Sequence, residues 1–216
     1  MKKAFLPLFL FVTALLFPLR ADAATAKEWL NARGKALIAA VTEKDAARRY
    51  AATKKVILTS FREKEFARLA LGRVKTLFEQ RHLDRYNELF LDYLLAKYIA
   101  KPVPVTGVDF TIGEEMPSGK DTLIRVDLKA TAEFTTLKKN GEIVTSDMQI
   151  ESVFALRGTG TGWYIRDVQI EGKSMLMFIR KDIDSLYETV YNDPDELLAS
   201  MERKIRNFKE DSNIVQ

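Results

Sequence analysis

The sequence has 216 residues, of which 47% are hydrophobic and 30% are charged, and its formal net charge is +4. A chain of this length can bury a sizeable core in one domain. The chain contains no cysteine, which excludes disulfides, thiol catalysis and thiolate metal sites. So small a net charge does not indicate nucleic-acid binding, which requires a basic patch or a known binding fold.

The first 23 residues have the three parts of a secretory signal peptide. Two lysines precede an apolar run from Ala4 to Phe17, and the small residues Ala21 and Ala23 follow it. The run is shorter than the roughly 20 residues that span a bilayer, so we predict a cleaved signal peptide over residues 1–23. Cleavage would leave residues 24–216 as a single soluble domain in the periplasm, with its net charge lowered to +2 because the segment holds three basic residues and one acidic residue.

The first half of the remaining chain has helical periodicity. Thr25 and Glu28 have the spacing of a capping box. Apolar residues then recur three and four positions apart, up to the prolines at 102 and 104. Four helices are therefore predicted, the second of them with a break: residues 29–41, 46–60, 66–77 and 83–99.

After residue 105 the apolar period changes to two. Residues 124–134 alternate between apolar and polar side chains, which predicts a strand with one apolar face and one wet face. Asn140-Gly141 is typical of a type I′ hairpin turn. Further strands are predicted over residues 148–156 and 163–171, and residues 108–112 fit an earlier one.

Two last helices are predicted, with Ser174 and Asp193 as their N-caps. Because strands and helices are segregated along the chain, the predicted class is α+β. We expect an antiparallel sheet of three to five strands packed against several helices around an apolar cavity.

Few residues fit a catalytic site. The only histidine, His82, is predicted to be a solvated residue between two helices, and one histidine cannot make a two-histidine zinc motif. A hydrolase would have to use Ser174 or His82, but Ser174 has no G-x-S-x-G elbow around it. The stretch from Gly113 to Lys120 lacks phosphate-loop spacing. We therefore expect no catalytic residue, no metal and no cofactor.

Two stretches resemble the MlaC / toluene-tolerance Ttg family of periplasmic phospholipid-binding proteins, which includes hopanoid-associated members. Phe66–Arg73 together with Tyr86–Leu94 is similar to the family's helical LGxYW…F…F…YL stretch. Trp163–Ser174 is similar to its W-x-v-x-D-v-x-v-E-G-v-S signature. The sequence departs from the family at Val74 and Lys75, where aromatic residues are frequent. The resemblance extends over nearly the whole chain after the predicted signal peptide.

The resemblance implies a mixed α/β fold around a deep apolar cavity that holds acyl chains, with the lipid headgroup facing solvent. It also implies shuttling between an outer-membrane complex and an inner-membrane ABC transporter, with transient membrane contact. Burial of a methylene is worth about 0.8 kcal/mol, so a 16-carbon chain represents roughly 13 kcal/mol. Apolar walls are compatible with a phospholipid or a hopanoid, and we expect a monomer.

Periodicity predicts which side chains bind the lipid. These residues are apolar and occupy the faces predicted to point inward: Phe66, Leu69, Ala70, Val74, Phe90, Tyr93, Leu94, Val126, Leu128, Phe154, Tyr164, Val168, Ile170, Met177, Phe178 and Ile183. An error of one residue in strand register would turn a strand's whole set outward.

One alternative is an exported structural or chaperone-like module with a solid core. Such a module would bind a protein partner through residues 44–85, which contain twelve Lys or Arg and five Asp or Glu. The same basic segment could dock on an anionic membrane surface.

Overall fold

The structure is a computed structural model that describes residues 24–99, 105–135, 143–159, 162–212 and 214. The predicted signal peptide and the predicted turn at Asn140-Gly141 lie outside these residues. Within the described ranges, no helix has both the length and the apolar character needed to cross a membrane.

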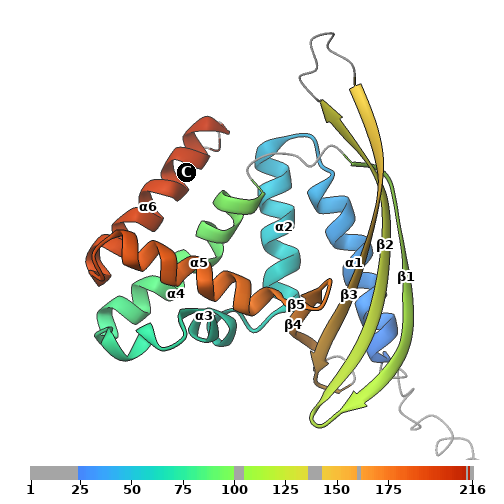
Figure 1. The fold of residues 1–216 in the computed structure, drawn as a ribbon, viewed down its shortest axis with the longest axis horizontal. Coiled ribbons are helices and arrows are strands. Elements are labelled where there is room, and N and C mark those ends of the chain that lie inside the picture. The colour runs from blue at the N-terminus through green and yellow to red at the C-terminus, as the bar shows by residue number, and fades with distance from the viewer. Residues whose placement is uncertain (1–23, 100–104, 136–142, 160–161, 213, 215–216) are drawn as a thin grey trace, which may run out of the picture.

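Helices and strands follow one another in blocks, so the predicted α+β class is confirmed (Figure 1). The first helical block precedes a five-stranded sheet, and two helices follow it. The elements are α1 (Ala26–Val41), α2 (Ala46–Ser60), α3 (Glu63–Leu71), the 3₁₀ helix η2 (Val74–Leu77), α4 (Gln80–Tyr98), β1 (Val105–Ser118), β2 (Asp121–Thr135), β3 (Ile143–Arg157), β4 (Tyr164–Ile170), β5 (Lys173–Ser174), α5 (Met175–Thr189) and α6 (Pro194–Asp211).

Side-chain caps start most of the helices. The predicted capping box of α1 is present: Thr25 Oγ1 accepts from the Glu28 amide, and the Glu28 carboxylate accepts from the Thr25 amide. Asp193 accepts from two amides of α6 and precedes its N1 proline. The predicted break in the second helix is wrong, because α2 runs unbroken from its cap at Asp45 to Ser60.

The predicted helix over residues 66–77 is two helices, which meet at Gly72. The backbone of Gly72 has φ of 60°, a left-handed value that glycine adopts without steric cost. A Cβ at this position would lie 2.9 Å from Cδ of Arg180, so α5 approaches the chain closely here. α3 therefore ends at Leu71, and Val74 belongs to η2.

The sheet is antiparallel, with strands in the order β1-β2-β3-β4-β5. Directly paired residues of an antiparallel sheet share a face. Val126 pairs with Ile112 in β1 and with Ser152 in β3, while Ile124 pairs with Phe154. The apolar set of β2 therefore lies on the sheet face covered by α1, and its charged set lies on the opposite face, as the alternation predicted.

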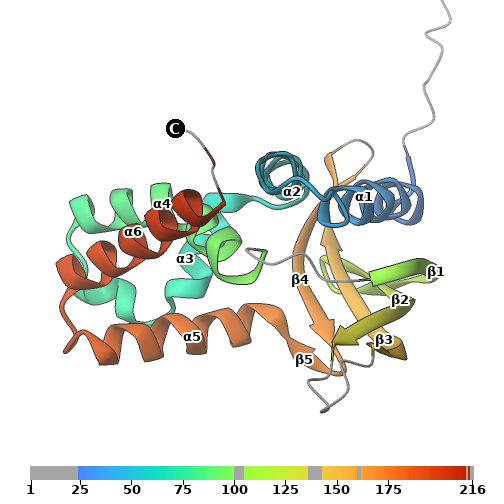
Figure 2. The same ribbon diagram turned by 90° about the horizontal axis from the view of Figure 1, so that it is seen from above.

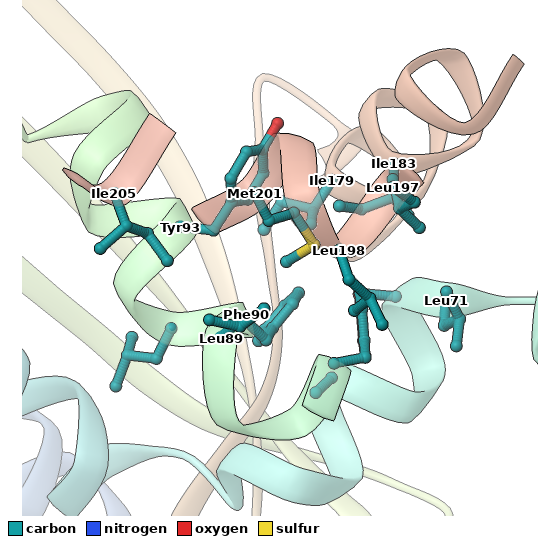
Figure 3. Packing of buried hydrophobic residues seen from close by; sticks show 14 of the residues in the cluster. Leu71, Leu89, Phe90, Tyr93, Ile179, Ile183, Leu197, Leu198, Met201 and Ile205 are labelled. Carbon is teal, nitrogen blue, oxygen red and sulfur yellow. The ribbon is translucent and has the colours of Figure 1, made fainter. Parts of the chain in front are cut away.

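Buried apolar side chains form two clusters. The helical cluster joins α2, α3, α4, α5 and α6, and Figure 3 shows Phe90, Leu198 and Met201 pointing toward one another within it. The sheet cluster joins α1 to β2, β3 and β4 through residues such as Trp29 and Ile124. Figures 1 and 2 show the same division: α1 lies against the sheet, and α3–α6 gather beyond its β4–β5 edge.

Candidate functional site

The two apolar clusters meet along a contact that we call the seam. Phe61 and Met175 are half-buried and pack against both clusters. Phe61 also forms an isolated parallel backbone bridge to Ile165 of β4, which ties the end of α2 to the sheet. From Phe61, aromatic rings continue into the helical cluster: its ring centroid lies 5.3 Å from that of Phe66, which lies 6.2 Å from that of Phe90.

A pocket opens at the seam, between α3 and β4. Its apolar lining consists of Phe66 and Leu69 from α3 and Ile165 from β4. Its cavity volume is about 10 Å³, and the wider hollow around it, about 190 Å³, includes open solvent. Its polar lining consists of Arg62, Glu65, Tyr164 and Arg166. An apolar floor beneath a rim of two arginines is suited to a molecule with an apolar tail and a negatively charged head.

The rim residues hold one another in place. The Arg62 guanidinium lies 4.0 Å from the centre of the Tyr164 ring and 3.9 Å from the Glu65 carboxylate. Arg166 lies 3.8 Å from the carboxylate of Asp121. The same carboxylate accepts a 2.7 Å hydrogen bond from Arg157 and thereby raises the pKa of that guanidinium. Arg62 therefore stacks on an aromatic face with one carboxylate nearby, and both arginines keep donors free for an anion.

A short polar network fixes the start of α5 beside the seam. Ser174 Oγ donates to Asp167 Oδ2 at 2.6 Å and accepts from the Met177 amide at 3.1 Å. Asp167 Oδ1 accepts from the Leu176 amide at 3.1 Å. Ser174 therefore caps α5, as predicted, and Asp167 joins β4 to the first turn of that helix.

The predicted binding residues of the helices lie mostly in the helical cluster. Five are buried: Phe66, Ala70, Phe90, Tyr93 and Ile183. Three are half-buried and pack against this cluster or line the pocket: Leu69, Val74 and Leu94. Of these eight helical residues, Phe66 and Leu69 line the pocket.

Most of the predicted binding residues of the sheet lie on its covered face, but Tyr164 of β4 does not. Val126 and Val168 are buried in the sheet cluster, and Leu128 and Phe154 are half-buried. Tyr164 does not share the face of Val168, because a register shift opposite Ala155 and Leu156 leaves Arg166 of β4 without a partner and pairs Tyr164 with Arg157. The position in the sheet cluster is taken instead by Ile165, which pairs with Leu156. Tyr164, the first residue of β4, lines the pocket.

Three predicted residues lie at the surface. Ile170, Met177 and Phe178 are 38%, 54% and 60% exposed. Ile170 does lie on the predicted face, because it pairs with Ser152, the partner of Val126, but that face is not covered here. The predicted inward orientation of Met177 and Phe178 is wrong. The buried stripe of α5 consists of Ile179, Ile183 and Tyr187. Phe178 lies beside this stripe.

The Phe178 ring packs against another exposed aromatic residue, Tyr98 at the end of α4. Their ring centroids are 6.2 Å apart. Tyr98 donates a hydrogen bond to Asp182 at 3.2 Å, and Lys97 also bonds this carboxylate. Partial burial and the Asp182 charge raise the pKa of Tyr98.

Sequence reasoning missed four residues at the seam. Met175 begins an apolar stretch whose buried face the sequence does not determine, and Ile165 turns inward because of the register shift between β3 and β4. Arg62 and Arg166 were missed because surface arginines are common and nothing in the sequence places them side by side. The fold alone brings these two together at the pocket rim.

The residues that a hydrolase would require lie apart. Ser174 caps α5 next to Asp167, whereas His82 lies in the first turn of α4. The prediction that His82 is solvated is wrong: it is 6% exposed, accepts from the Glu79 amide through Nδ1, and has Nε2 3.3 Å from the Asp195 carboxylate. Among the described residues, no group of three or more histidine and carboxylate side chains is arranged to hold a metal.

Comparison with known proteins places the chain in a family. The family model described as MlaC protein matches residues 35–203, well over half of the chain. A solved structure of a phospholipid-binding protein from Ralstonia solanacearum, in complex with a phospholipid, has the same fold, with a TM-score of 0.62 at 12% sequence identity. The match covers 86% of this chain and 99% of that chain. No curated protein matches the chain in sequence. By the extent of the family match, this chain belongs to the MlaC family.

Proposed function

We propose that this protein binds a phospholipid or a related membrane lipid, such as a hopanoid, in the periplasm. Its acyl chains would lie between the helical and sheet clusters, with the headgroup at the pocket rim beside Arg62 and Arg166. The observation that carries the proposal is the seam: two separate apolar clusters meet at a pocket with an apolar floor and a cationic rim. The bound phospholipid of the Ralstonia relative supports the same class of ligand.

The size of the pocket indicates how binding would proceed. Sites for small molecules have volumes of roughly 300–1,000 Å³, whereas the cavity volume of the pocket at the seam is about 10 Å³. A lipid tail would therefore require the two clusters to move apart. The tail itself would replace the lost contacts, because each buried methylene is worth about 0.8 kcal/mol.

The lining of the widened seam follows from the positions of the predicted residues. Phe66, Leu69 and Ile183 would form its helical wall, and Val168 and Phe154 its sheet wall. The half-burial of Leu128 and Phe154 supports this arrangement, because apolar side chains on the covered face of a sheet are ordinarily closed over by packing. Phe178 and Ile170 would close over the tails at the edge of the seam.

The transport role extends the same proposal. A lipid crosses an aqueous compartment slowly unless its tails are covered, so a carrier in the periplasm would shuttle lipid between an outer-membrane complex and an inner-membrane ABC transporter. Family membership supports this role. The proposal includes no catalytic step and no cofactor, and the carrier would act as a monomer.

Lipid uptake tests the proposal. The purified protein is incubated with phosphatidylethanolamine and phosphatidylglycerol vesicles, re-isolated, and weighed by native mass spectrometry. We expect one phospholipid per chain, and loss of this adduct in Leu69→Glu, which places a charge on the pocket floor. Leu58→Glu is the matched control, because Leu58 is 43% exposed on α2. Protein that stays empty under all conditions contradicts the proposal and favours the solid-core module.

A further inference from the structure

Two segments far apart in the sequence contain basic residues and no acidic residue. The first, Phe66–Phe78, spans most of α3 and all of η2. The second, Gly172–Lys181, spans β5 and the first two turns of α5. Their basic residues are Arg68, Arg73, Lys75, Lys173, Arg180 and Lys181.

The fold brings the two segments together. Arg180 donates from Nη2 and Nε to the carbonyl oxygen of Leu69, at 2.6 and 3.1 Å, and its side chain lies against Gly72. The ring of Phe78, at the end of the first segment, lies 5.8 Å from that of Tyr187 farther along α5. Figure 1 shows α3 running beside the first turns of α5. We call the surface formed by both segments the α3–α5 face.

The charges of the α3–α5 face are available for an external partner. Arg68, Arg73, Lys75, Lys173 and Lys181 are all exposed. Among the residues that the structure describes, none of the five forms an ion pair, whereas Arg81 and Arg85 just beyond the first segment are paired with carboxylates. The face therefore has a concentrated positive charge that the protein itself does not neutralise.

Large apolar side chains are also exposed on the two segments. Leu77 is 66% exposed in η2, and Met177 is 54% exposed in α5. Phe178, which is 60% exposed, follows Met177. Apolar side chains flanked by lysine and arginine are the pattern of surfaces that rest on a bilayer, where the chains enter the interface and the basic groups bind anionic headgroups. An acidic protein surface would also match the charge, and the vesicle experiment below distinguishes such a surface from a bilayer.

We infer that the α3–α5 face binds the surface of an anionic lipid bilayer. It adjoins the pocket, because Phe66 and Leu69 belong to α3 and line the pocket from the same helix. A bilayer bound there would place lipid headgroups next to Arg62 and Arg166. The inference goes beyond the proposed function, since the face would bind a membrane whether or not the seam accepts a lipid.

Vesicle co-sedimentation of the full chain tests the inference. The probes are vesicles of phosphatidylglycerol mixed with phosphatidylcholine, and vesicles of phosphatidylcholine alone. The test variant is Arg73→Gln/Lys75→Gln/Lys181→Gln. The control variant is Lys35→Gln/Lys44→Gln/Lys55→Gln, which removes the same charge at exposed positions of α1, α2 and the connection between them. These three lysines form no ion pair within the described part of the chain.

We expect the unsubstituted chain to sediment with the anionic vesicles and to be released by salt. The affinity of the test variant for the anionic vesicles should fall on the order of 100-fold, because each basic group near an anionic surface contributes about a factor of five. The affinity of the control variant should stay within a few-fold of that of the unsubstituted chain. Leu77→Ser/Met177→Ser should weaken the binding that persists at high salt.

Two results would overturn the inference. Equal losses in the test and control variants would show that total charge, and not this face, determines binding. Absence of binding to the anionic vesicles would exclude a bilayer and leave an acidic protein surface as the partner of the face. Lipid uptake measured on the same variants separates either result from a failure of the proposed function.

Discussion

Arg180 of α5 donates two hydrogen bonds to the carbonyl oxygen of Leu69 in α3, at 3.1 and 2.6 Å. The bonds are charge-assisted and half-buried, and they join the helix that follows the sheet to the helix that lines the pocket. Removal of the guanidinium leaves the carbonyl without this partner. We expect Arg180→Ala to lower the free energy of unfolding by roughly 1.5–3 kcal/mol.

Denaturant unfolding of Arg180→Ala measures this loss. Lys181→Ala is the control, because Lys181 is the next residue and is exposed, so its replacement should change the free energy of unfolding by less than about 0.5 kcal/mol. Equal effects of the two substitutions would contradict a structural role for the Arg180–Leu69 contact.

The Arg180 side chain that bonds the Leu69 carbonyl also lies against Gly72. Gly72→Ala would place a Cβ 2.9 Å from the Arg180 side chain, on a backbone with φ of 60°. We expect a loss of about 1–3 kcal/mol in the free energy of unfolding, from backbone strain and displacement of Arg180. Gly162→Ala should cost much less, because no atom of the described residues, its chain neighbours apart, lies within 4 Å of the added Cβ. Thermal melts that coincide for the two variants would refute this account of the α3–η2 break.

Asp167 and Ser174 should act as one unit at the start of α5. Ser174→Ala removes an N-cap and should cost about 1 kcal/mol, and Asp167→Ala removes acceptors from Ser174 and the Leu176 amide. Because the two side chains share a 2.6 Å hydrogen bond, the double variant should lose less than the sum of the single losses, by roughly 0.5–3 kcal/mol. A double-mutant cycle with strictly additive unfolding energies would show that they act independently.

The alternation of β2 was sufficient to predict its buried face. Ile124 and Val126 are buried and Arg125 is exposed, because a strand with one covered face must alternate. Periodicity failed at β4, where the register shift separates Tyr164 from Val168 and brings Ile165 inward. A shift of this kind depends on the neighbouring strand, so β4's own sequence does not reveal it.

The predicted site was least accurate on α5. Residues 175–179 are five consecutive apolar residues, so their sequence does not select which face of the helix is buried. The buried stripe begins at Ile179, and Met177 and Phe178 remain exposed. The break at Gly72 was missed because helical spacing continues through it. Arg62 and Arg166 are separated by a hundred residues, and only the fold reveals that they share the pocket rim.

Because of Tyr98, the free energy of unfolding should fall as pH rises through the alkaline range. Burial and Asp182 raise its pKa above the ordinary value of 10.0, so the folded state retains the phenolic proton after the unfolded state has released it. Stability from Tyr98 is therefore present below pH 10 and is lost as pH rises further. Tyr98→Phe loses the hydrogen bond to Asp182, worth about 1 kcal/mol at neutral pH, but does not have this alkaline loss.

Unfolding of Tyr98→Phe across neutral and alkaline pH measures this difference. The gap between the original chain and the variant should narrow above pH 10. Tyr191→Phe serves as the control, because Tyr191 is 94% exposed and should follow the original chain throughout. A constant gap at all pH values would contradict the coupling between Tyr98 and Asp182.

The seam can be locked with a reversible cross-link, because the chain has no cysteine of its own. Phe61 and Ile165 form a backbone bridge, and the Cα atoms of such partners lie about 5 Å apart, within the range that a disulfide spans. Phe61→Cys/Ile165→Cys would join the two clusters when oxidised and release them when reduced. Lys129→Cys/Gln149→Cys is the control, since this pair joins β2 to β3 on exposed positions and leaves the seam free.

Phospholipid uptake from vesicles, followed by native mass spectrometry of the oxidised and reduced forms of both cysteine pairs, tests most directly whether lipid enters between the two clusters. We predict that the oxidised Phe61→Cys/Ile165→Cys protein stays empty and takes up one phospholipid after reduction, while the control pair takes up lipid in both forms. Equal uptake by the oxidised and reduced seam pair would contradict a binding site that opens at the seam.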